Sequence, residues 1–416
     1  MQQQGILFDL IAGSRKFTIY QPIILYRKFS ADFIFNGYEL LQHQVLITDD
    51  AGVIIDLVPE TAAGDHIEEL QGIICPGFIN AHCHLELSHM KGLIPKHSGL
   101  VDFLLKVITG RHFDETTILT AIEDAETDML QNGIVAVGDI CNNTHTIRQK
   151  SLGRLQYHNF IEVAGFIPAL AKDRFDKAIL VLDEYRLQLA GSRSTVSPHA
   201  PYSVSPELFA MVNDATANSL MTIHNQETEA ENEFMEKGSG DFTRLYKQIG
   251  IDIGFFKTSA QTSLQTWLPY FTKPRSILLV HNVATTAADI AFLQRSTNND
   301  QRSNYLCLCP NANLYISNQL PDVKMLMQHA EHIVLGTDSL ASNDQLSILD
   351  EMKTLQQQKQ LPLAALLQWA TSNGARALQL DKQLGSFEKG KQPGLVLISG
   401  VEHTALTAGS LAKRIL

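Results

Sequence analysis

The stretch Pro76-Gly77-Phe78-Ile79-Asn80-Ala81-His82-Cys83-His84 decides the fold, because it reads as a buried strand that ends in two histidines. Side chains two residues apart in a strand project from the same face, so both imidazoles are expected to enter one space. Two neutral imidazoles on one face are ligands that zinc accepts. The alternative interpretation is a pair of hydrogen-bonded core histidines.

Other predicted strands end in comparable residues. In chain order these ends carry His199, His224 followed by Glu227, His281, and Asp338. The carboxyl ends of the strands of a (β/α)8 barrel converge on the active site. Five strand ends that each carry His, Glu or Asp are hard to explain as independent accidents. Together they predict a catalytic metal site.

The region outward from the paired histidines, about residues 76–381, alternates short apolar runs with stretches of helical period. The runs are 133–138, 195–198, 220–224, 276–281, 305–309 and 333–336, and helices are predicted over 116–131, 206–217, 287–295 and 346–359. Apolar strands joined by crossover helices predict an α/β protein with a parallel sheet. Their number over roughly 300 residues predicts a (β/α)8 TIM-like barrel.

The two flanks of this region read as β-structure. Four short runs, 23–26, 32–34, 45–48 and 53–58, are separated by turn-forming residues. The run 395–398 follows the barrel too late to extend it, so we expect it to return to the N-terminal strands. The sequence therefore predicts a discontinuous β-sandwich domain from residues 1–75 and 382–416, around a barrel of residues 76–381. No role is assigned to residues 1–22.

Composition excludes several classes of partner. The 416 residues include 33 Lys and Arg against 44 Asp and Glu, a net charge of −11, with no basic run, which argues against nucleic-acid binding. No apolar stretch reaches the roughly 18 residues of a membrane-spanning helix. Five cysteines without a regular spacing favour reduced thiols, including buried ones at Cys307 and Cys309. The opening residues 1–5 do not read as a signal peptide, so we expect a cytoplasmic protein.

The order of the motifs resembles the amidohydrolase superfamily, and more narrowly its mononuclear aminohydrolases and chlorohydrolases that act on cyclic amidines. Further motifs that carry the resemblance are Ser197-Pro198-His199-Ala200-Pro201-Tyr202-Ser203, Cys309-Pro310-Asn311-Ala312-Asn313, Leu335-Gly336-Thr337-Asp338-Ser339 and Leu384-Gly385-Ser386-Phe387-Glu388-Lys389-Gly390-Lys391. Dinuclear members place a carboxylated lysine at the end of the fourth strand, where this chain has His199. That departure argues for one metal ion rather than two.

The resemblance implies a ligand set for one divalent metal ion, with zinc favoured and iron as the alternative: His82, His84, His224 and Asp338. Three His and one Asp leave a position open for water, whose pKa a metal lowers from near 15.7 toward about 7. Asp338 would also accept the proton of this water. Asn313 is expected to organise its loop.

Two further residues are expected to act on the substrate. Glu227 would donate a proton to a ring nitrogen, the alternative being a carboxylate that fixes a His ligand. His281 would orient the attacking water and the group being displaced. His199 either contacts the substrate or has a structural role.

The segment Leu85-Glu86-Leu87-Ser88 resembles deaminases of adenine-type nucleosides, including aminodeoxyfutalosine deaminases. Glu86 would bind ribose hydroxyls or an exocyclic amine, with helix capping or solvent exposure as the alternatives. A small heterocyclic substrate and a homodimer are implied.

The favoured function is therefore hydrolytic deamination of an N-heterocyclic amidine, most simply an adenine-type nucleoside. Three alternatives stay open: hydrolysis of another C–N or C–Cl bond, deamination of a guanine- or cytosine-type base, and a scaffold that lost its chemistry. The histidine His89 stays undecided. The remaining histidines are interpreted as ordinary surface or capping residues: His43, His66, His97, His112, His145, His158, His329, His332 and His403.

Overall fold

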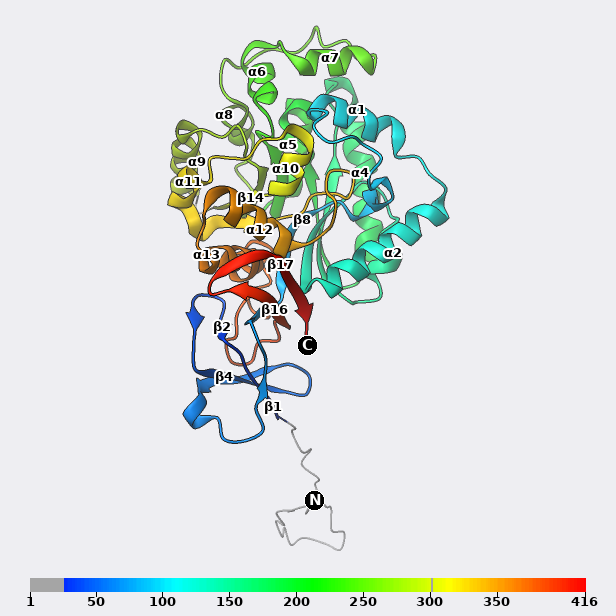
Figure 1. Cartoon of the computed structure of the whole chain (residues 1–416). Coiled ribbons are helices and arrows are strands. Elements are labelled where there is room, and N and C mark those ends of the chain that lie inside the picture. The colour runs from blue at the N-terminus through cyan, green and yellow to red at the C-terminus, as the bar shows by residue number, and fades with distance from the viewer. Residues whose placement is uncertain (1–25, 301) are drawn as a thin grey trace, which may run out of the picture.

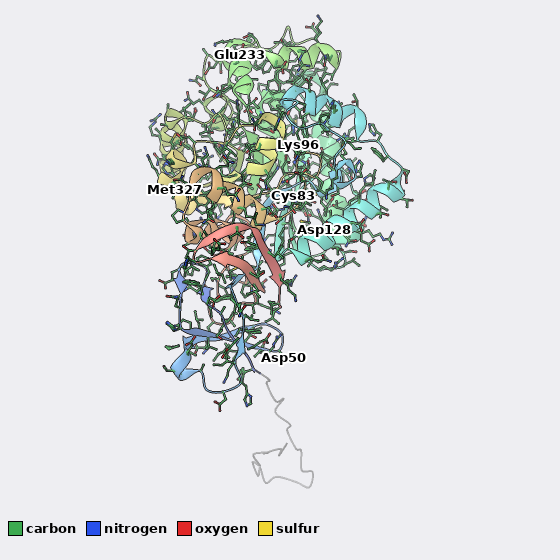
Figure 2. The ribbon with its side chains drawn as sticks, viewed as in Figure 1. Asp50, Cys83, Lys96, Asp128, Glu233 and Met327 are labelled. Atoms are coloured by element: carbon green, nitrogen blue, oxygen red, sulfur yellow. The ribbon has the colours of Figure 1, made fainter. Side chains whose placement is uncertain are left out.

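The larger part of the protein is an α/β body in which helices surround parallel strands, and a smaller β-structured part lies below it (Figure 1). The structure is a computed structural model that describes residues 26–300 and 302–416. Cys83, between the paired histidines, lies inside the larger body, whereas Asp50 lies in the smaller part (Figure 2). The paired histidines are therefore interior residues.

Eight parallel strands form two four-stranded sheets. The first has the order β11-β10-β9-β8 and the second β12-β13-β14-β15. Both junctions between the sheets are in contact: a parallel bridge joins Cys83 to Asp338, and the backbone N–H of His224 donates to the carbonyl of His199 at 3.0 Å. This arrangement fits a TIM-like α/β fold. The strands are β8 (Phe78–Cys83), β9 (Ile134–Cys141), β10 (Gln156–Val163), β11 (Arg193–Pro198), β12 (Leu220–Asn225), β13 (Ser276–His281), β14 (Ser303–Leu308) and β15 (Ile333–Leu335).

The helices follow the strands along the chain, and local capping fixes several of their starts. The side chain of Asp114 accepts from the backbone N–H of Thr117 to begin α2, and Ser205 accepts from Leu208 to begin α5. The four predicted helices are found with shifted ends, as α2, α5, α9 and α12. The helices are α1 (Leu100–Gly110), α2 (Glu115–Gln131), α3 (Ile147–Lys150), α4 (Ala171–Gln188), α5 (Pro206–Ala215), α6 (Glu229–Lys237), α7 (Asp241–Gln248), α8 (Ser263–Trp267), α9 (Ala287–Asp300), α10 (Pro310–Ser317), α11 (Val323–Leu326), α12 (Ile348–Lys359), α13 (Leu363–Gln368) and α14 (Gly374–Ala377).

The strand β10 was not predicted from the sequence. Its residues mix polar and apolar types, so it lacks the apolar run that marks the other parallel strands. The expectation that His158 is a surface or capping residue is wrong, because it is 2 % exposed within this strand. Its ring stacks on Phe160 at 4.5 Å, and burial lowers its pKa to about 3.

The smaller part joins both ends of the described chain. β16 (Leu395–Glu402) pairs antiparallel with β7 (Ile73–Pro76) and with β17 (Ala405–Arg414), in a sheet that also holds β2 (Phe33–Phe35) and β3 (Leu40–Leu41). A second sheet has the order β5-β4-β1-β6. Its strands are β5 (Ile54–Pro59), β4 (Gln44–Asp49), β1 (Tyr26–Ser30) and β6 (Glu68–Glu69).

One hydrophobic cluster draws side chains from both of these sheets, among them Phe29, Leu46, Ile74 and Leu395. The predicted strand 23–26 lies outside the described residues except at Tyr26, where β1 begins. All five cysteines are buried and unbridged, as expected. Among the described residues, no helix combines the length and apolarity that crossing a membrane requires.

A fully buried ion pair anchors the segment that follows the paired histidines. Lys150 Nζ lies 2.5 Å from Asp139 Oδ2, and both side chains are at most 1 % exposed. The other Asp139 oxygen accepts the backbone N–H of Leu85 at 2.8 Å, directly after His84. The Lys150 ammonium also donates to Asn159 at 2.8 Å and lies over the ring of Tyr157. The pair therefore fixes the backbone at the end of β8.

We expect Lys150→Met to lower the free energy of unfolding by about 3–5 kcal/mol, because it leaves the Asp139 carboxylate buried without its cation. The exposed pair between Lys172 and Asp176, 2.6 Å apart, provides the control, and Lys172→Met should cost less than about 1 kcal/mol. Urea unfolding of both variants measures the difference. Equal small losses would show that the buried pair contributes no more than an exposed one.

Candidate active site

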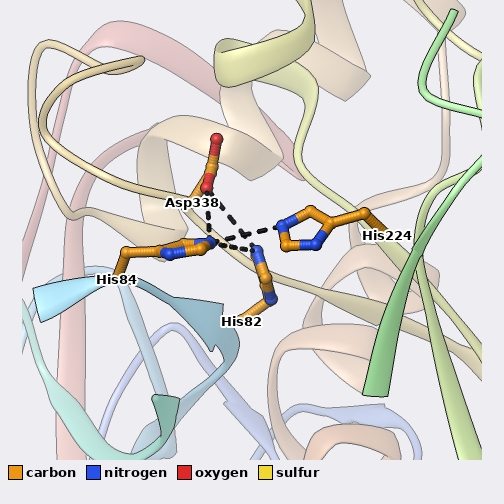
Figure 3. Close-up of side chains that lie close together, drawn as sticks. All are labelled: His82, His84, His224 and Asp338. Carbon is orange, nitrogen blue, oxygen red and sulfur yellow. Dashed lines mark hydrogen bonds and ion pairs between the residues drawn. The ribbon is translucent and has the colours of Figure 1, made fainter. Parts of the chain in front are cut away.

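Four residues from three strand ends meet at one point (Figure 3). His82 lies in β8, His84 directly after it, His224 in β12, and Asp338 three residues beyond the end of β15. The Nε2 atom of His84 lies 3.2 Å from that of His82 and 3.3 Å from that of His224. The Oδ1 atom of Asp338 lies 3.5 Å from His82 Nε2 and 3.4 Å from His84 Nε2.

These four atoms have the spacing of a metal-ligand shell. A tetrahedral zinc site with metal–ligand distances of about 2.0–2.1 Å separates its ligand atoms by about 3.3–3.4 Å. Nδ1 of His224 lies 2.8 Å from the carbonyl oxygen of His199 and must carry the ring proton there, so its Nε2 presents a lone pair. This lone pair faces two imidazole nitrogens and a carboxylate oxygen, a set of N and O donors that suits a cation between them. The residues present therefore fit one divalent metal ion.

Neighbouring side chains hold these ligands in place. Ser342 Oγ donates to the second Asp338 oxygen at 2.6 Å. Asn80 and Thr337 exchange two hydrogen bonds, of 2.7 and 3.1 Å, which tie β8 to the segment before Asp338. The backbone of Asp338 itself has φ 57°, a left-handed conformation that costs of order 1–3 kcal/mol in a residue other than glycine.

Glu227 and His281 lie beside the metal ligands. His281 Nε2 is 3.7 Å from Glu227 Oε2, and both side chains are at most 6 % exposed. Asn313 Nδ2 donates to His281 Nδ1 at 3.0 Å, so Asn313 orients this ring, a contact that the sequence did not predict. The backbone N–H of Glu227 donates to Glu231 at 3.1 Å. Asn313 thus orients the ring of His281, and Glu231 holds the backbone of Glu227.

Two buried carboxyl groups of the site have opposite pKa shifts. Burial, followed by the charges of Asp338 and Glu231, raises the pKa of Glu227 well above its usual value. Burial also acts to raise the pKa of Asp338, but a hydrogen bond with His82 and the charges of His84 and His281 lower it below its usual range. These shifts favour the protonated form of Glu227 and the ionised form of Asp338, the arrangement that separates an acid from a base.

Burial favours the neutral form of His84, His199, His224 and His281. It lowers the pKa of His224 and of His199 to about 4, and that of His84 and His281 well below the usual value. Neutral imidazoles are the form that binds metals.

The structure places His199 next to this centre and Glu86 further away. The ring centroid of His199 is 4.9 Å from that of His224, and its Nδ1 is 2.7 Å from Ser203 Oγ. Glu86 is 3 % exposed, so solvent exposure is the wrong alternative for it. One Glu86 oxygen accepts the backbone N–H of Asn142 at 2.9 Å, and burial raises its pKa to about 7.

Sequence reasoning missed Glu162, near the end of β10. It lies 3.8 Å from His224 Nδ1, and a polar atom from each of Glu162, His199 and His224 lies within 4.8 Å of the others. The only available signal was its place near the end of a strand that went unrecognised.

The comparisons with known proteins agree with this geometry. The Amidohydrolase family matches residues 73–413. The chain belongs to the amidohydrolase family. A 5-methylthioadenosine/S-adenosylhomocysteine deaminase of Saccharophagus degradans is 26 % identical over 384 residues, which cover 86 % of this chain and 79 % of that protein. An adenosine deaminase of Helicobacter pylori is 28 % identical over 333 residues, with 78 % of each chain covered.

Among solved structures, the amidohydrolase chain is similar to Helicobacter pylori aminofutalosine deaminase in complex with methylthio-coformycin. The TM-score is 0.75 at 24 % identity, with 92 % of this chain and 93 % of that chain covered. This likeness establishes a shared fold over nearly the whole chain.

We expect the purified amidohydrolase to carry about one equivalent of a divalent metal, and His84→Gln to retain less than about a tenth of it, because a ligand at the centre of the cluster is lost. His158→Gln is the matched control, since His158 is equally buried but lies outside the cluster. Metal analysis of gel-filtered protein measures both. Full metal content in His84→Gln would contradict the assigned ligand set.

Proposed function

We propose that this amidohydrolase is a metal-dependent hydrolytic deaminase that releases ammonia from an adenine-type nucleoside. The observation that carries the proposal is the cluster of His82, His84, His224 and Asp338, which fits one metal ion and has the buried carboxyl group of Glu227 and the ring of His281 beside it. The raised pKa of Glu227 and the lowered pKa of Asp338 suit an acid and a base. The similar proteins named above are deaminases of adenosine and of methylthioadenosine or S-adenosylhomocysteine. An aromatic amidine needs both an acid for its ring nitrogen and a base for the attacking water.

We propose His82, His84, His224 and Asp338 as the ligands of one ion, with zinc favoured and iron as the alternative. Imidazole and carboxylate suit both metals. When it is bound, such an ion supplies Lewis-acid chemistry that lowers the pKa of a water molecule.

The chain's own residues move the protons. Asp338 takes a proton from water and passes it to the amine that leaves. Glu227 gives its proton to the ring nitrogen and recovers one from the attacking oxygen. The oxygen of water thereby forms the new carbon–oxygen bond, the exocyclic carbon–nitrogen bond breaks, and ammonia departs. His281, oriented by Asn313, holds the water on the correct side of the ring.

We also propose that the eight parallel strands close into a (β/α)8 barrel over residues 76–381. Contacts at both junctions between the two parallel sheets support this closure. Residues 1–75 and 382–416 would form one discontinuous β-sandwich domain, a proposal supported by the pairing of β16 with β7. A cytoplasmic location and a homodimer stay predictions.

A deamination panel tests the function. We expect metal-loaded protein to release ammonia from adenosine, 5′-deoxyadenosine or methylthioadenosine, and to act far more slowly on guanine and cytosine, because the similar proteins are deaminases of adenine-type nucleosides. Ammonia is measured by a coupled assay, and a chlorotriazine tests the other leaving group. Turnover of the chlorotriazine without any ammonia release from nucleosides would refute the proposal.

We expect Glu227→Gln to lower kcat by roughly 10²–10⁴-fold, because an amide cannot donate the carboxyl proton. Metal content should not change, since Glu227 is outside the ligand set. In the unaltered enzyme the rate should fall as pH rises through the raised pKa of Glu227, since only the protonated form acts. Glu227→Gln should abolish this alkaline decline. Retention of full activity would rule out the acid role.

A further inference from the structure

We propose that Glu162 binds the ribose hydroxyls of the substrate, in a subsite beside the metal centre that includes Tyr202. The inference rests on the proposed deaminase function. It assigns a binding residue to the ribose, the part of a nucleoside that the metal ligands and Glu227 do not hold.

Glu162 faces the interior enclosed by the parallel strands. It lies two residues beyond Phe160 in β10, so both side chains project from the same face. Phe160 packs in the interior cluster that also contains Ile79 and Val280 of other parallel strands. Glu162 is one layer closer to the strand ends, where its carboxyl group lies within 4.8 Å of His199 and His224.

One oxygen of this carboxyl group lacks a hydrogen-bond donor. Oε1 accepts from Asn142 Nδ2 at 3.1 Å, but Oε2 is buried and has no hydrogen-bond partner in the part of the chain that the structure describes. His224 Nδ1 is 3.8 Å away, and its proton is directed to the carbonyl oxygen of His199. A buried carboxylate oxygen without a donor is costly, so a donor from a ligand would stabilise the site.

A second unpartnered group lies beside His199. The ring of Tyr202 meets that of His199 edge-on, with the centroids 5.7 Å apart. Its hydroxyl oxygen is buried, again without a partner among the described residues. Glu86, for which the sequence predicts ribose binding, accepts the backbone N–H of Asn142 with one of its oxygens. Glu86 therefore positions Asn142, and through it Glu162.

The chemistry of the substrate identifies the donor. An adenine nucleoside carries two kinds of donor, its exocyclic amine and its hydroxyls. The amine is the group that leaves at the metal centre, so it is not free to satisfy Glu162. The vicinal 2′- and 3′-hydroxyls are common to these nucleosides whatever group the 5′ carbon carries. Each hydroxyl both donates and accepts, which matches a carboxylate that accepts and a phenol that can do either.

The test compares adenosine with 2′,3′-dideoxyadenosine, on unaltered protein and on Glu162→Gln. We expect the unaltered protein to prefer adenosine by roughly 10- to 100-fold in kcat/KM, the range for a hydrogen bond to a charged acceptor. In Glu162→Gln, kcat/KM for adenosine should fall by the same roughly 10- to 100-fold. The kcat/KM for the dideoxy compound should change by less than about threefold. Calorimetric binding constants for the two nucleosides should show the same loss of preference.

Controls separate this role from a structural one. Glu126 is also fully buried, but its oxygens accept from Tyr157 at 2.8 Å and from Gln149 at 2.5 Å. We expect Glu126→Gln to change the melting temperature and to leave the preference for adenosine intact. Tyr202→Phe should weaken the preference in the same direction as Glu162→Gln.

Two results would overturn the subsite. If Glu162→Gln lowers kcat/KM equally for both nucleosides and also reduces the metal content, Glu162 acts through His224. A lack of preference in the unaltered protein would show that the hydroxyls are not bound. Calorimetry distinguishes failure of the proposed function: selective binding of adenosine without ammonia release supports the subsite and refutes the deaminase.

Discussion

Three imidazole nitrogens and one carboxylate oxygen are held together at the ends of strands that lie far apart in the sequence, and the rest of the site depends on this constraint. Spacings of 3.2 to 3.5 Å leave room for a metal ion, and the ring proton of His224 is directed elsewhere. Contact between β8 and β15 brings the ligands together, because the bridge from Cys83 to Asp338 sets the paired histidines against the carboxylate.

Two buried carboxyl groups of the site have pKa values that are shifted in opposite directions by their surroundings. Asp338 accepts hydrogen bonds and lies beside imidazoles, so its ionised form is favoured. Glu227 is buried near the negative charge of Asp338, so its protonated form is favoured. One environment therefore shifts two carboxyl groups in opposite directions, as the proposed acid and base require.

Patterns of one residue type over short distances were predictable, whereas contacts made across strands were not. The apolar runs that end near His82, His224, His281 and Asp338 predicted a parallel sheet, because a buried parallel strand is apolar throughout. The polar residues at the ends of these runs predicted the site. The mixed composition of β10 concealed that strand, and with it Glu162. The contact between Asn313 and His281 joins α10 to the end of β13, and no local pattern records it.

By itself the sequence determined the class of chemistry, since it supplied the imidazoles, the carboxylates and their order along the chain, together with the acidic composition that excludes nucleic acids. Only the tertiary structure decided which of these groups lie together. The pKa of a group and its fitness as a ligand depend on distances of a few ångströms and on burial. Distances and burial are properties of the folded chain, which brings residues such as Glu162, His199 and His224 together.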